Sequence, residues 1–405
     1  MRWLWRFYAE RMTHAGRWFL WPFLATGAYA SLTLSNQPYV ALAYATVFWL
    51  VAFASLRLCA PKVRLRVTHP SRVCAGETLP VEVTVENAGR RAVADLQLLP
   101  HRLPLSIDAV PEDGIAIPPV PAGRSARATL GLRCGRRGEQ RLRGWRAETD
   151  FPLGLLNARR VLWSESAVLV YPRFTPLARL ELPTGRRYQP GGVALASVVG
   201  ESTEFIGNRE YREGDSLRDI DWKATARMQR PIVREYREEY FLRVAVILDT
   251  HVPAGAPAAR REDFERAVSI CAAVGDSIAR QESIVDIFAA GPDLYHLVAG
   301  RGLAYLDQIL DILACVEESP AEPFAAIEPE LAANLERITS VVCVFLDWDE
   351  RRRAFVENMR QQGVGIRLVV VRDAPCALDP AADPLAPGRV AMIDAKRFSA
   401  GVEEL

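Results

Sequence analysis

Two stretches near the N-terminus, residues 18–34 and 39–56, contain no charged residue. At roughly 1.5 Å per residue, each stretch makes a helix about 26 Å long, close to the thickness of the hydrocarbon core of a bilayer. The link between them, residues 35–38, is short and polar, so the two helices run antiparallel. The sequence therefore predicts a transmembrane helical hairpin over residues 18–56.

Positive charge flanks this hairpin on both outer sides, and the link carries none. Basic residues beside membrane spans stay preferentially in the cytoplasm. We therefore expect a cytoplasmic tail at residues 1–17 and a cytoplasmic body after the second span. The basic residues are Arg2, Arg6, Arg11 and Arg17 before the hairpin, and Arg57, Lys62, Arg64 and Arg66 after it.

Two other interpretations of these stretches stay open. Residues 28–30 resemble a signal-peptidase site, although cleavage there still leaves the second span to return the chain to the cytoplasm. Alternatively the stretches are core helices of a soluble protein, which the short link and the basic flanks disfavour.

The composition is that of a globular protein. Half of the residues are hydrophobic and 24% are charged, and about 340 residues follow the hairpin, enough for two domains. Residues 57–240 hold 30 Lys+Arg against 22 Asp+Glu (+8), whereas residues 241–405 hold 16 against 26 (−10). No dense basic run with interleaved aromatic residues occurs, so we expect no nucleic-acid partner. The seven cysteines form no CxxC pair, which predicts neither a disulfide framework nor a zinc site.

Residues 62–172 have the two-residue periodicity of β-strands. Apolar and polar side chains alternate in residues 63–67, 79–86, 128–133 and 161–171. Turn residues recur about every ten positions, without a helix-length pattern between them. This pattern predicts an antiparallel β-sandwich.

Residues 241–397 alternate continuous apolar runs with helical patterns, and residues 398–405 are left as a C-terminal tail. Such an order predicts a parallel sheet wound with helices on both faces, whose ligands sit at the carboxyl ends of the strands. Asp249 and Asp347 stand at two such ends. The strands are expected at residues 244–249, 283–288, 341–347 and 366–371, and the helices at 262–280 and 351–362.

Residues 173–240 connect the two predicted domains and contain the densest charge in the chain. Asp215 is expected to cap a short helix whose Trp222 packs inward, and residues 231–239 alternate like a strand. Opposite charges at this density favour forked pairing of arginine with carboxylate, which fixes geometry more than it adds stability.

This segment resembles the signature of a bacterial membrane-protein family called domain of unknown function fifty-eight, whose pattern reads approximately REYxxGDxxRxIxWKxxAR followed by VREYexE. The wider layout is similar too, because that family has a hairpin anchor, a β-sandwich, the signature and then a von Willebrand factor A-like domain. We expect the signature to couple the two domains. Its residues in this sequence are Arg209, Glu210, Tyr211, Gly214, Asp215, Arg218, Asp221, Trp222, Lys223, Arg227, Arg234, Glu235 and Tyr236.

The resemblance also implies partners. Members of that family typically accompany a MoxR-type AAA+ ATPase and often a transglutaminase-like membrane protein. It therefore implies a scaffold or adaptor in the bacterial cytoplasmic (inner) membrane, which works with such an ATPase in assembly or remodelling of envelope proteins. Its remaining contacts are expected to be other membrane proteins and the lipid bilayer.

A metal-dependent binding module is the alternative function. Integrin-type A domains hold Mg²⁺ through a D-x-S-x-S loop, because a hard cation takes oxygen ligands. Asp249 matches the first ligand and Asp347 offers a second carboxylate, but His251 and Pro253 fill the two serine positions.

A hydrolase built on Asp249 and His251 is a third possibility. It lacks a serine or cysteine nucleophile motif, and no HExxH, GxxxxGK or GxSxG sequence occurs. We therefore expect no enzymatic activity.

Overall fold

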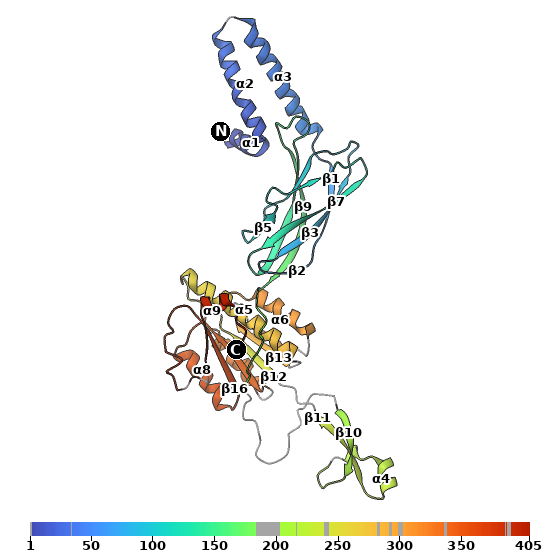
Figure 1. The fold of residues 1–405 in the computed structure, drawn as a ribbon, viewed down its shortest axis with the longest axis vertical. Helices are drawn as coiled ribbons and strands as arrows, with labels where there is room; N and C mark the ends of the chain where they lie inside the picture. The colour runs from blue at the N-terminus through green and yellow to red at the C-terminus, as the bar shows by residue number, and fades with distance from the viewer. Residues whose placement is uncertain are drawn as a thin grey trace. The chain divides into compact units, whose positions relative to one another are not determined.

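The structure is a computed structural model of the 405-residue chain. It describes residues 2–33, 35–183, 203–215, 217–238, 243–281, 284–290, 294–298, 303–335, 338–384, 386 and 390–405. The chain divides into two compact units, Met1–Arg173 and Phe174–Leu405, whose elements are labelled in Figure 1.

The first unit begins with three helices, α1 (Arg2–Arg11), α2 (His14–Leu32) and α3 (Asn36–Leu58). Among the described residues, α3 is the one helix that is long and apolar enough to cross a membrane. The other predicted span, residues 18–34, is matched less fully by the structure. Its helix α2 begins with His14 and contains the charged residue Arg17. Only residues 18–32 of α2 are both helical and uncharged, which is shorter than the roughly 17–25 residues of a typical span.

Two β-sheets follow the helices and share one hydrophobic core. The core joins alternate residues of β3, such as Val81 and Val83, to Leu98, Trp145 and Val168 of the facing sheet. Every second side chain of β3 is buried, as expected for a sheet with one face in the core and one face exposed to solvent. The strands are β1 (Val63–Thr68), β2 (Arg72–Cys74), β3 (Thr78–Asn87), β4 (Leu96–Pro100), β5 (Ile107–Val110), β6 (Ile115–Ile117), β7 (Ser125–Cys134), β8 (Gly138–Thr149) and β9 (Ala158–Tyr171).

The strand orders are β1-β3-β7-β5 in one sheet and β2-β9-β8-β4-β6 in the other. Their described pairs are antiparallel, with β2 and β9 as the exception. The prediction of a wholly antiparallel arrangement is therefore wrong at this edge. The three-residue β2 lies in the segment that connects β1 to β3, and it adds beside β9 in the parallel direction.

The turn after β8 packs against the helices. Leu155 and Leu156 form a small apolar cluster with Met12 of the α1–α2 junction and with Trp49 and Ala52 of α3. This cluster ties the β-sheets of the unit to its helices.

The second unit contains a six-stranded sheet in the order β14-β13-β12-β15-β16-β17. Its strands pair in parallel, which confirms the predicted parallel sheet, but β14 runs antiparallel to β13 at one edge. The strands are β12 (Arg243–Leu248), β13 (Ile284–Ala290), β14 (Leu294–Val298), β15 (Ser340–Phe345), β16 (Gly365–Val371) and β17 (Ala391–Ile393). The helices are α5 (Ala258–Arg280), α6 (Leu303–Cys315), α7 (Phe324–Asn334), α8 (Glu350–Gln361) and α9 (Ala395–Ala400).

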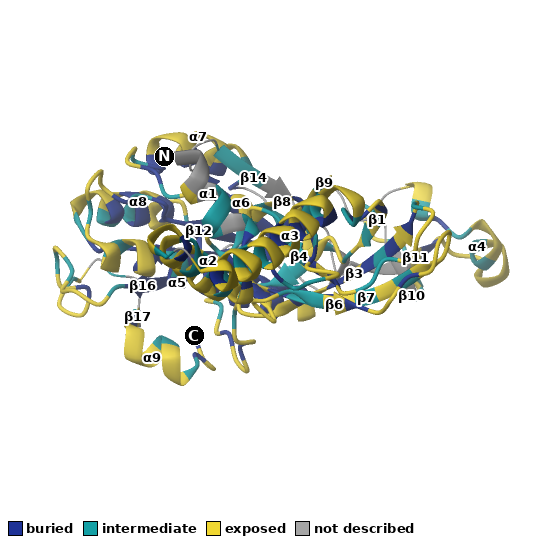
Figure 2. Cartoon of the chain, turned by 90° about the horizontal axis from the view of Figure 1, so that it is seen from above, coloured by how far each residue is buried: buried dark blue, intermediate teal, exposed yellow. Residues whose placement is uncertain are grey.

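Helices cover both faces of this sheet. Ala245 and Ile247 of β12 join a core with residues of α7 and α8, so the alternate residues Val244 and Val246 point to the other face, where α5 contacts β12. The central strands are buried, as Figure 2 shows for β12 and β16. Strands buried on both faces explain the continuous apolar runs in the sequence.

The signature segment forms a separate two-stranded hairpin. Its strands β10 (Thr203–Glu210) and β11 (Ile232–Glu238) pair antiparallel, and a 3₁₀ turn η1 (Leu217–Asp219) and helix α4 (Trp222–Met228) lie between them. The start and the end of the unit are paired, because the backbone N atoms of Ala178 and Arg179 donate hydrogen bonds to Glu403 O and that of Leu405 donates to Arg179 O.

Candidate functional site

Asp249 lies at the carboxyl end of β12, completely buried beside the end of β15. Its Oδ1 accepts a hydrogen bond from the His251 backbone N at 3.0 Å, and its Oδ2 accepts one from the Leu346 backbone N at 3.0 Å. Neighbouring parallel strands end at the same edge of the sheet, which brings these loops together. The structure therefore brings the ends of β12 and β15 together, as expected from the sequence. What this edge can bind depends on the side chains that contact Asp249.

Arg352 of α8 faces Asp249. Its Nε donates to Asp249 Oδ2 at 2.8 Å, and its Nη2 lies 2.7 Å from the same oxygen. Arg352 is 1% exposed and also pairs with Asp349, whose side chain caps α8, while the Phe324 ring lies 5.6 Å away. Burial disfavours the charge, but Asp249 and Asp349 outweigh it and raise the pKa of Arg352 above its ordinary value. The guanidinium therefore stays charged.

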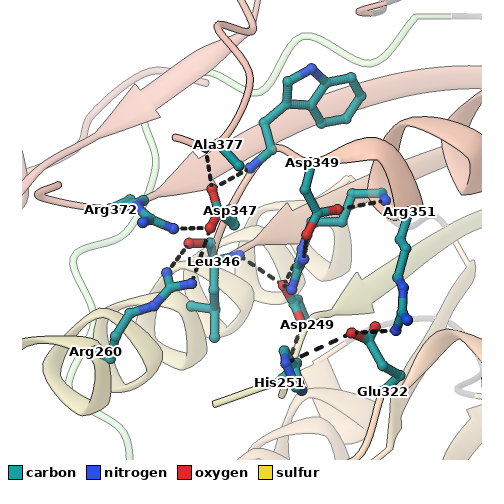
Figure 3. Close-up of polar contacts among 12 residues, drawn as sticks. Asp249, His251, Arg260, Glu322, Leu346, Asp347, Asp349, Arg351, Arg372 and Ala377 are labelled. Carbon is teal, nitrogen blue, oxygen red and sulfur yellow. Dashed lines mark hydrogen bonds and ion pairs between the residues drawn. The ribbon is translucent and has the colours of Figure 1, made fainter. Parts of the chain in front are cut away.

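Asp347, at the end of β15, is also engaged by arginines (Figure 3). It accepts hydrogen bonds from Arg372 and, at 3.2 Å, from Arg260. Backbone donors reach the other carboxylate oxygen from Trp348 at 2.9 Å and from Ala377 at 3.1 Å. Both sheet-edge carboxylates proposed as metal ligands are thus neutralised by arginine side chains.

These residues do not fit the Mg²⁺ site considered from the sequence. Within the part of the chain that the structure describes, no group of three or more His, Cys, Asp and Glu side chains is placed to hold a metal. Both carboxylate oxygens of Asp249 are already engaged, Oδ1 by the His251 backbone N and Oδ2 by Arg352. The loop also supplies His251 and Pro253 where hydroxyl ligands would be needed.

The hydrolase arrangement is not assembled either. The His251 ring faces the Ala321 carbonyl at 3.4 Å and Glu322 at 3.7 Å, and Glu322 pairs in turn with Arg351 at 2.7 Å. The hydrogen bond described between Asp249 and His251 comes from the His251 backbone N and not from its ring. The His251 ring therefore faces Ala321 and Glu322 and does not form a dyad with Asp249.

The signature hairpin has its own polar framework, in which Arg209 forms a bidentate ion pair with Asp215. The two guanidinium nitrogens lie 2.7 and 2.8 Å from the two carboxylate oxygens, and the Arg212 backbone N donates to Oδ2 at 2.7 Å. Hydrogen bonds from Arg209 and then from Arg212 lower the pKa of Asp215 to about 2. Gly214 has a φ of 105°, which favours glycine in this turn. The predicted forked pairing is thus present here.

Asp221, rather than Asp215, caps the short helix α4. Its Oδ1 accepts from the backbone N atoms of Lys223 and Ala224, each at 3.0 Å. The Ala224 hydrogen bond is the main cause that lowers the pKa of Asp221. The prediction that Asp215 caps this helix is therefore wrong. The sequence signal that was missed is an Asp directly before the helix, because such a side chain can accept hydrogen bonds from the first backbone N–H groups of the helix.

Trp222 is 70% exposed, so the prediction that it packs inward is wrong. The small core of the hairpin is made by Ile220, Ile232 and Val233. A two-stranded hairpin carrying one seven-residue helix has no second layer in which a tryptophan ring can be buried.

The remaining signature residues surround this framework. Glu210 pairs with Arg230, the Tyr211 backbone N donates to Pro231 O at 3.0 Å, and Arg234 lies 3.6 Å from Asp221. Arg218, Lys223 and Arg227 are exposed, while Glu235 and Tyr236 are placed on β11 but their side chains lie outside the described residues.

Residues 207–378 match the model of a family described as "Protein of unknown function DUF58". The match begins in the signature hairpin and extends through β16 into the loop after it. It therefore includes both the Arg209–Asp215 pair and the Arg352–Asp249 pair.

A curated relative, "Uncharacterized protein YeaD" of Bacillus subtilis (strain 168), is 23% identical over 267 residues. The alignment covers 64% of this chain and 64% of the relative, so this chain spans less than two thirds of that protein. A solved structure titled "AvmM Catalyzes Macrocyclization in Alchivemycin A Biosynthesis" is 14% identical, with 28% of this chain and 92% of that chain covered at a TM-score of 0.21. That similarity is too low to support an argument about fold or function.

Proposed function

Because this chain belongs to the DUF58 family, we propose that it is a membrane-anchored, non-enzymatic adaptor that works with a MoxR-type AAA+ ATPase in the assembly or remodelling of envelope proteins. The observation that carries the proposal is the pairing of Arg352 with Asp249. It places a permanently charged, buried side chain, paired with the carboxylates of Asp249 and Asp349, at the sheet edge where α/β proteins usually carry their reactive or metal-binding groups.

The second unit is proposed to be a von Willebrand factor A-like domain. Its order, with the first strand β12 between β13 and β15, is that of a doubly wound sheet, and an antiparallel edge strand such as β14 is common in large α/β sheets. In such a domain a bound cation commonly supplies the positive charge at the edge of the sheet where the ligand binds. Here Arg260, Arg352 and Arg372 supply the positive charge instead, which supports binding without a metal.

The anchor is proposed to be a multi-pass hairpin in the bacterial inner membrane. α2 would be the first span and α3, the helix long and apolar enough to cross a membrane, would be the second. α3 then returns the chain, with Arg57 and Lys62 after it on the cytoplasmic side. Exposed aromatic rings on α2, including Trp18 and Trp21, are of the kind found at membrane–water boundaries. The soluble parts then lie in the cytoplasm, where a AAA+ ATPase is available.

The test is direct binding between the full-length chain in lipid nanodiscs and the purified MoxR-type ATPase of the same bacterium. Binding is measured with ATP analogue and Mg²⁺, and then with the chain treated with EDTA beforehand and dialysed. We expect binding that survives chelator treatment of this chain, and no turnover of peptide, ester or phosphate substrates by the chain alone. Absence of binding in every nucleotide state would contradict the proposal.

The Mg²⁺-dependent alternative has a distinct outcome in the same experiment. Binding that is lost after EDTA treatment, returns with Mg²⁺ and disappears in Asp249→Asn would show that Asp249 holds a cation. The contacts of Asp249 with Arg352 oppose that outcome.

A further inference from the structure

The loop between the two hairpin strands exposes three large apolar side chains. Leu217, Trp222 and Met228 are 69%, 70% and 57% exposed. All three come from η1 and α4, which Figure 1 shows at the end of the hairpin and Figure 2 shows as largely exposed. We call residues 211–231 the hairpin tip. Solitary exposed apolar residues are ordinary, but three within one short loop mark a contact surface.

Two of the four carboxylates of the hairpin tip are turned toward internal partners. Asp215 is held by Arg209 and the Arg212 backbone N, and Asp221 is held by the first backbone N atoms of α4. The tip formally carries five basic and four acidic residues, yet two of the four carboxylates are already satisfied. One of the five cations, Arg230, is paired with Glu210 as well. The surface presented outward is therefore apolar, with a small excess of positive over negative charge.

The exposed cations lie beside the exposed apolar groups in the sequence. Lys223 follows Trp222 directly, and Arg227 precedes Met228. Tryptophan, methionine and arginine are the residue types enriched where proteins bind one another. A partner that covers this tip has to offer apolar surface together with negative charge.

The tip is also held in one conformation before any partner binds. The Arg209–Asp215 fork, the Asp221 cap and the hydrogen bond from Ile232 N to Thr225 Oγ1 at 3.0 Å each fix one part of it. The backbone N of Tyr211 donates to Pro231 O at 3.0 Å and joins its two ends. A surface that is ordered beforehand loses less conformational entropy on binding. An exposed tryptophan on such a support can act as an anchor residue.

We propose that the hairpin tip is the surface by which this chain binds its protein partner, and that it docks into an apolar groove rimmed by carboxylates. This inference rests on the proposed adaptor function. A lipid surface fits the tip less well, because lipid-binding segments need clusters of about four to eight basic residues with little acidic charge, whereas Glu213 and Asp219 also lie in the tip.

The test uses the nanodisc chain and the purified MoxR-type ATPase as the probe. Trp222→Ser is compared with Trp163→Ser, since Trp163 is 64% exposed on β9 in the other unit. We expect Trp222→Ser to weaken binding at least about 10-fold, and Trp163→Ser to leave it unchanged. Because the Trp222 ring is largely exposed, the hairpin keeps its core and the Asp215 carboxyl keeps its low pKa in this variant.

Charge is tested with a second matched pair of substitutions. Lys223→Glu is compared with Lys396→Glu, an exposed lysine of α9. We expect Lys223→Glu to weaken binding several-fold and to reduce its dependence on salt concentration, because it removes attraction between exposed charges. Lys396→Glu should leave both quantities unchanged.

The outcomes separate the inference from the adaptor function. If the unsubstituted chain binds the ATPase and Trp222→Ser binds equally well, the docking surface is refuted and the adaptor function stands. If the unsubstituted chain does not bind, both are refuted. If Trp222→Ser in the full-length nanodisc chain instead abolishes its binding to phosphatidylglycerol vesicles and leaves ATPase binding intact, the occupant is a lipid surface and the inference is wrong.

Discussion

Arg352 donates a hydrogen bond from Nε to Oδ2 of Asp249 at 2.8 Å, and both side chains are almost completely buried. The pair joins helix α8 to the end of strand β12. A covalently attached guanidinium cannot dissociate or be removed by a chelator, so the charge at this edge of the sheet is constant. The edge is therefore suited to a fixed binding surface and not to metal-dependent switching.

Removing the guanidinium should destabilise the α/β domain strongly. Arg352→Ala leaves Asp249 buried without its charged partner, which costs about 3–5 kcal/mol. Arg351→Ala is the control, because Arg351 is an exposed neighbour whose pair with Glu322 contributes only about 0–1 kcal/mol. Hydrogen exchange of the β12 amides in the full-length chain measures the opening free energy. Equal protection in the two variants would show that Arg352 does not stabilise this edge.

Asp215 should remain ionised to unusually low pH. Its folded pKa is about 2, against an ordinary value of 3.8, so the carboxylate favours the folded hairpin throughout the range above pH 3.8. That contribution is lost as the pH falls from 3.8 toward about 2, because protonation then breaks the fork. NMR titration of the Asp215 carboxyl carbon gives the midpoint directly.

The matched variant for this titration is Arg209→Ala, which removes the first cause of the shift. The midpoint in Arg209→Ala should move up toward 3.8, while Arg212→Ala should keep a low midpoint, because Arg212 binds Asp215 through its backbone N. A midpoint near 3.8 in the unsubstituted chain would argue against the fork in solution.

The elements with strong periodicity were predictable from the sequence. Strands β12, β15 and β16 are buried on both faces, which gives continuous apolar runs. Strand β3 is buried on one face, which gives alternation of apolar and polar residues. The antiparallel edge strand β14 was not predictable in the same way, because five residues are too short a run to show a clear periodicity. The parallel addition of β2 to β9 depends on tertiary placement that local pattern does not encode.

The candidate site was predictable in position but not in chemistry. Asp249 and Asp347 were placed at strand ends by the apolar runs before them, but Arg352 lies 103 residues from Asp249 in sequence, and its pairing follows only from how α8 packs. Within the signature, charge density predicted forked pairing of arginine with carboxylate, but not that Arg209 and Asp215 form it. The exposure of Trp222 was not predictable, since hydrophobicity alone predicts burial and takes no account of the missing second layer.

Helix α3 should be required for membrane attachment. Val47 and Leu50 are exposed on α3, and each arginine placed near the middle of a span costs about 2.5–3.5 kcal/mol on insertion. The double variant Val47→Arg/Leu50→Arg should therefore shift the chain out of the carbonate-resistant membrane fraction. The control Leu105→Arg/Val110→Arg makes the same changes at exposed positions of the β-sheet part and should not. Equal retention of both variants would show that α3 does not span the bilayer.

The junction between the helices and the β-sheets should depend on a close approach at Gly16. A Cβ atom at Gly16 would lie 2.1 Å from the Leu155 backbone O, whereas one at Gly27 of the same helix would lie 3.7 Å from its nearest neighbour, Leu42 Cδ1. Gly16→Val must therefore displace the turn that holds Thr13, whose backbone N donates to Leu155 O at 3.1 Å. Hydrogen exchange at the Thr13 amide should accelerate at least about 10-fold in Gly16→Val, a shift in opening free energy of about 1.4 kcal/mol, and stay unchanged in Gly27→Val. If this amide is equally protected in both variants, the β-sheets are not fastened to the helices through this contact. The Met12–Trp49–Leu156 cluster and the hydrogen bonds between Arg11 and Asn157 then hold the joint.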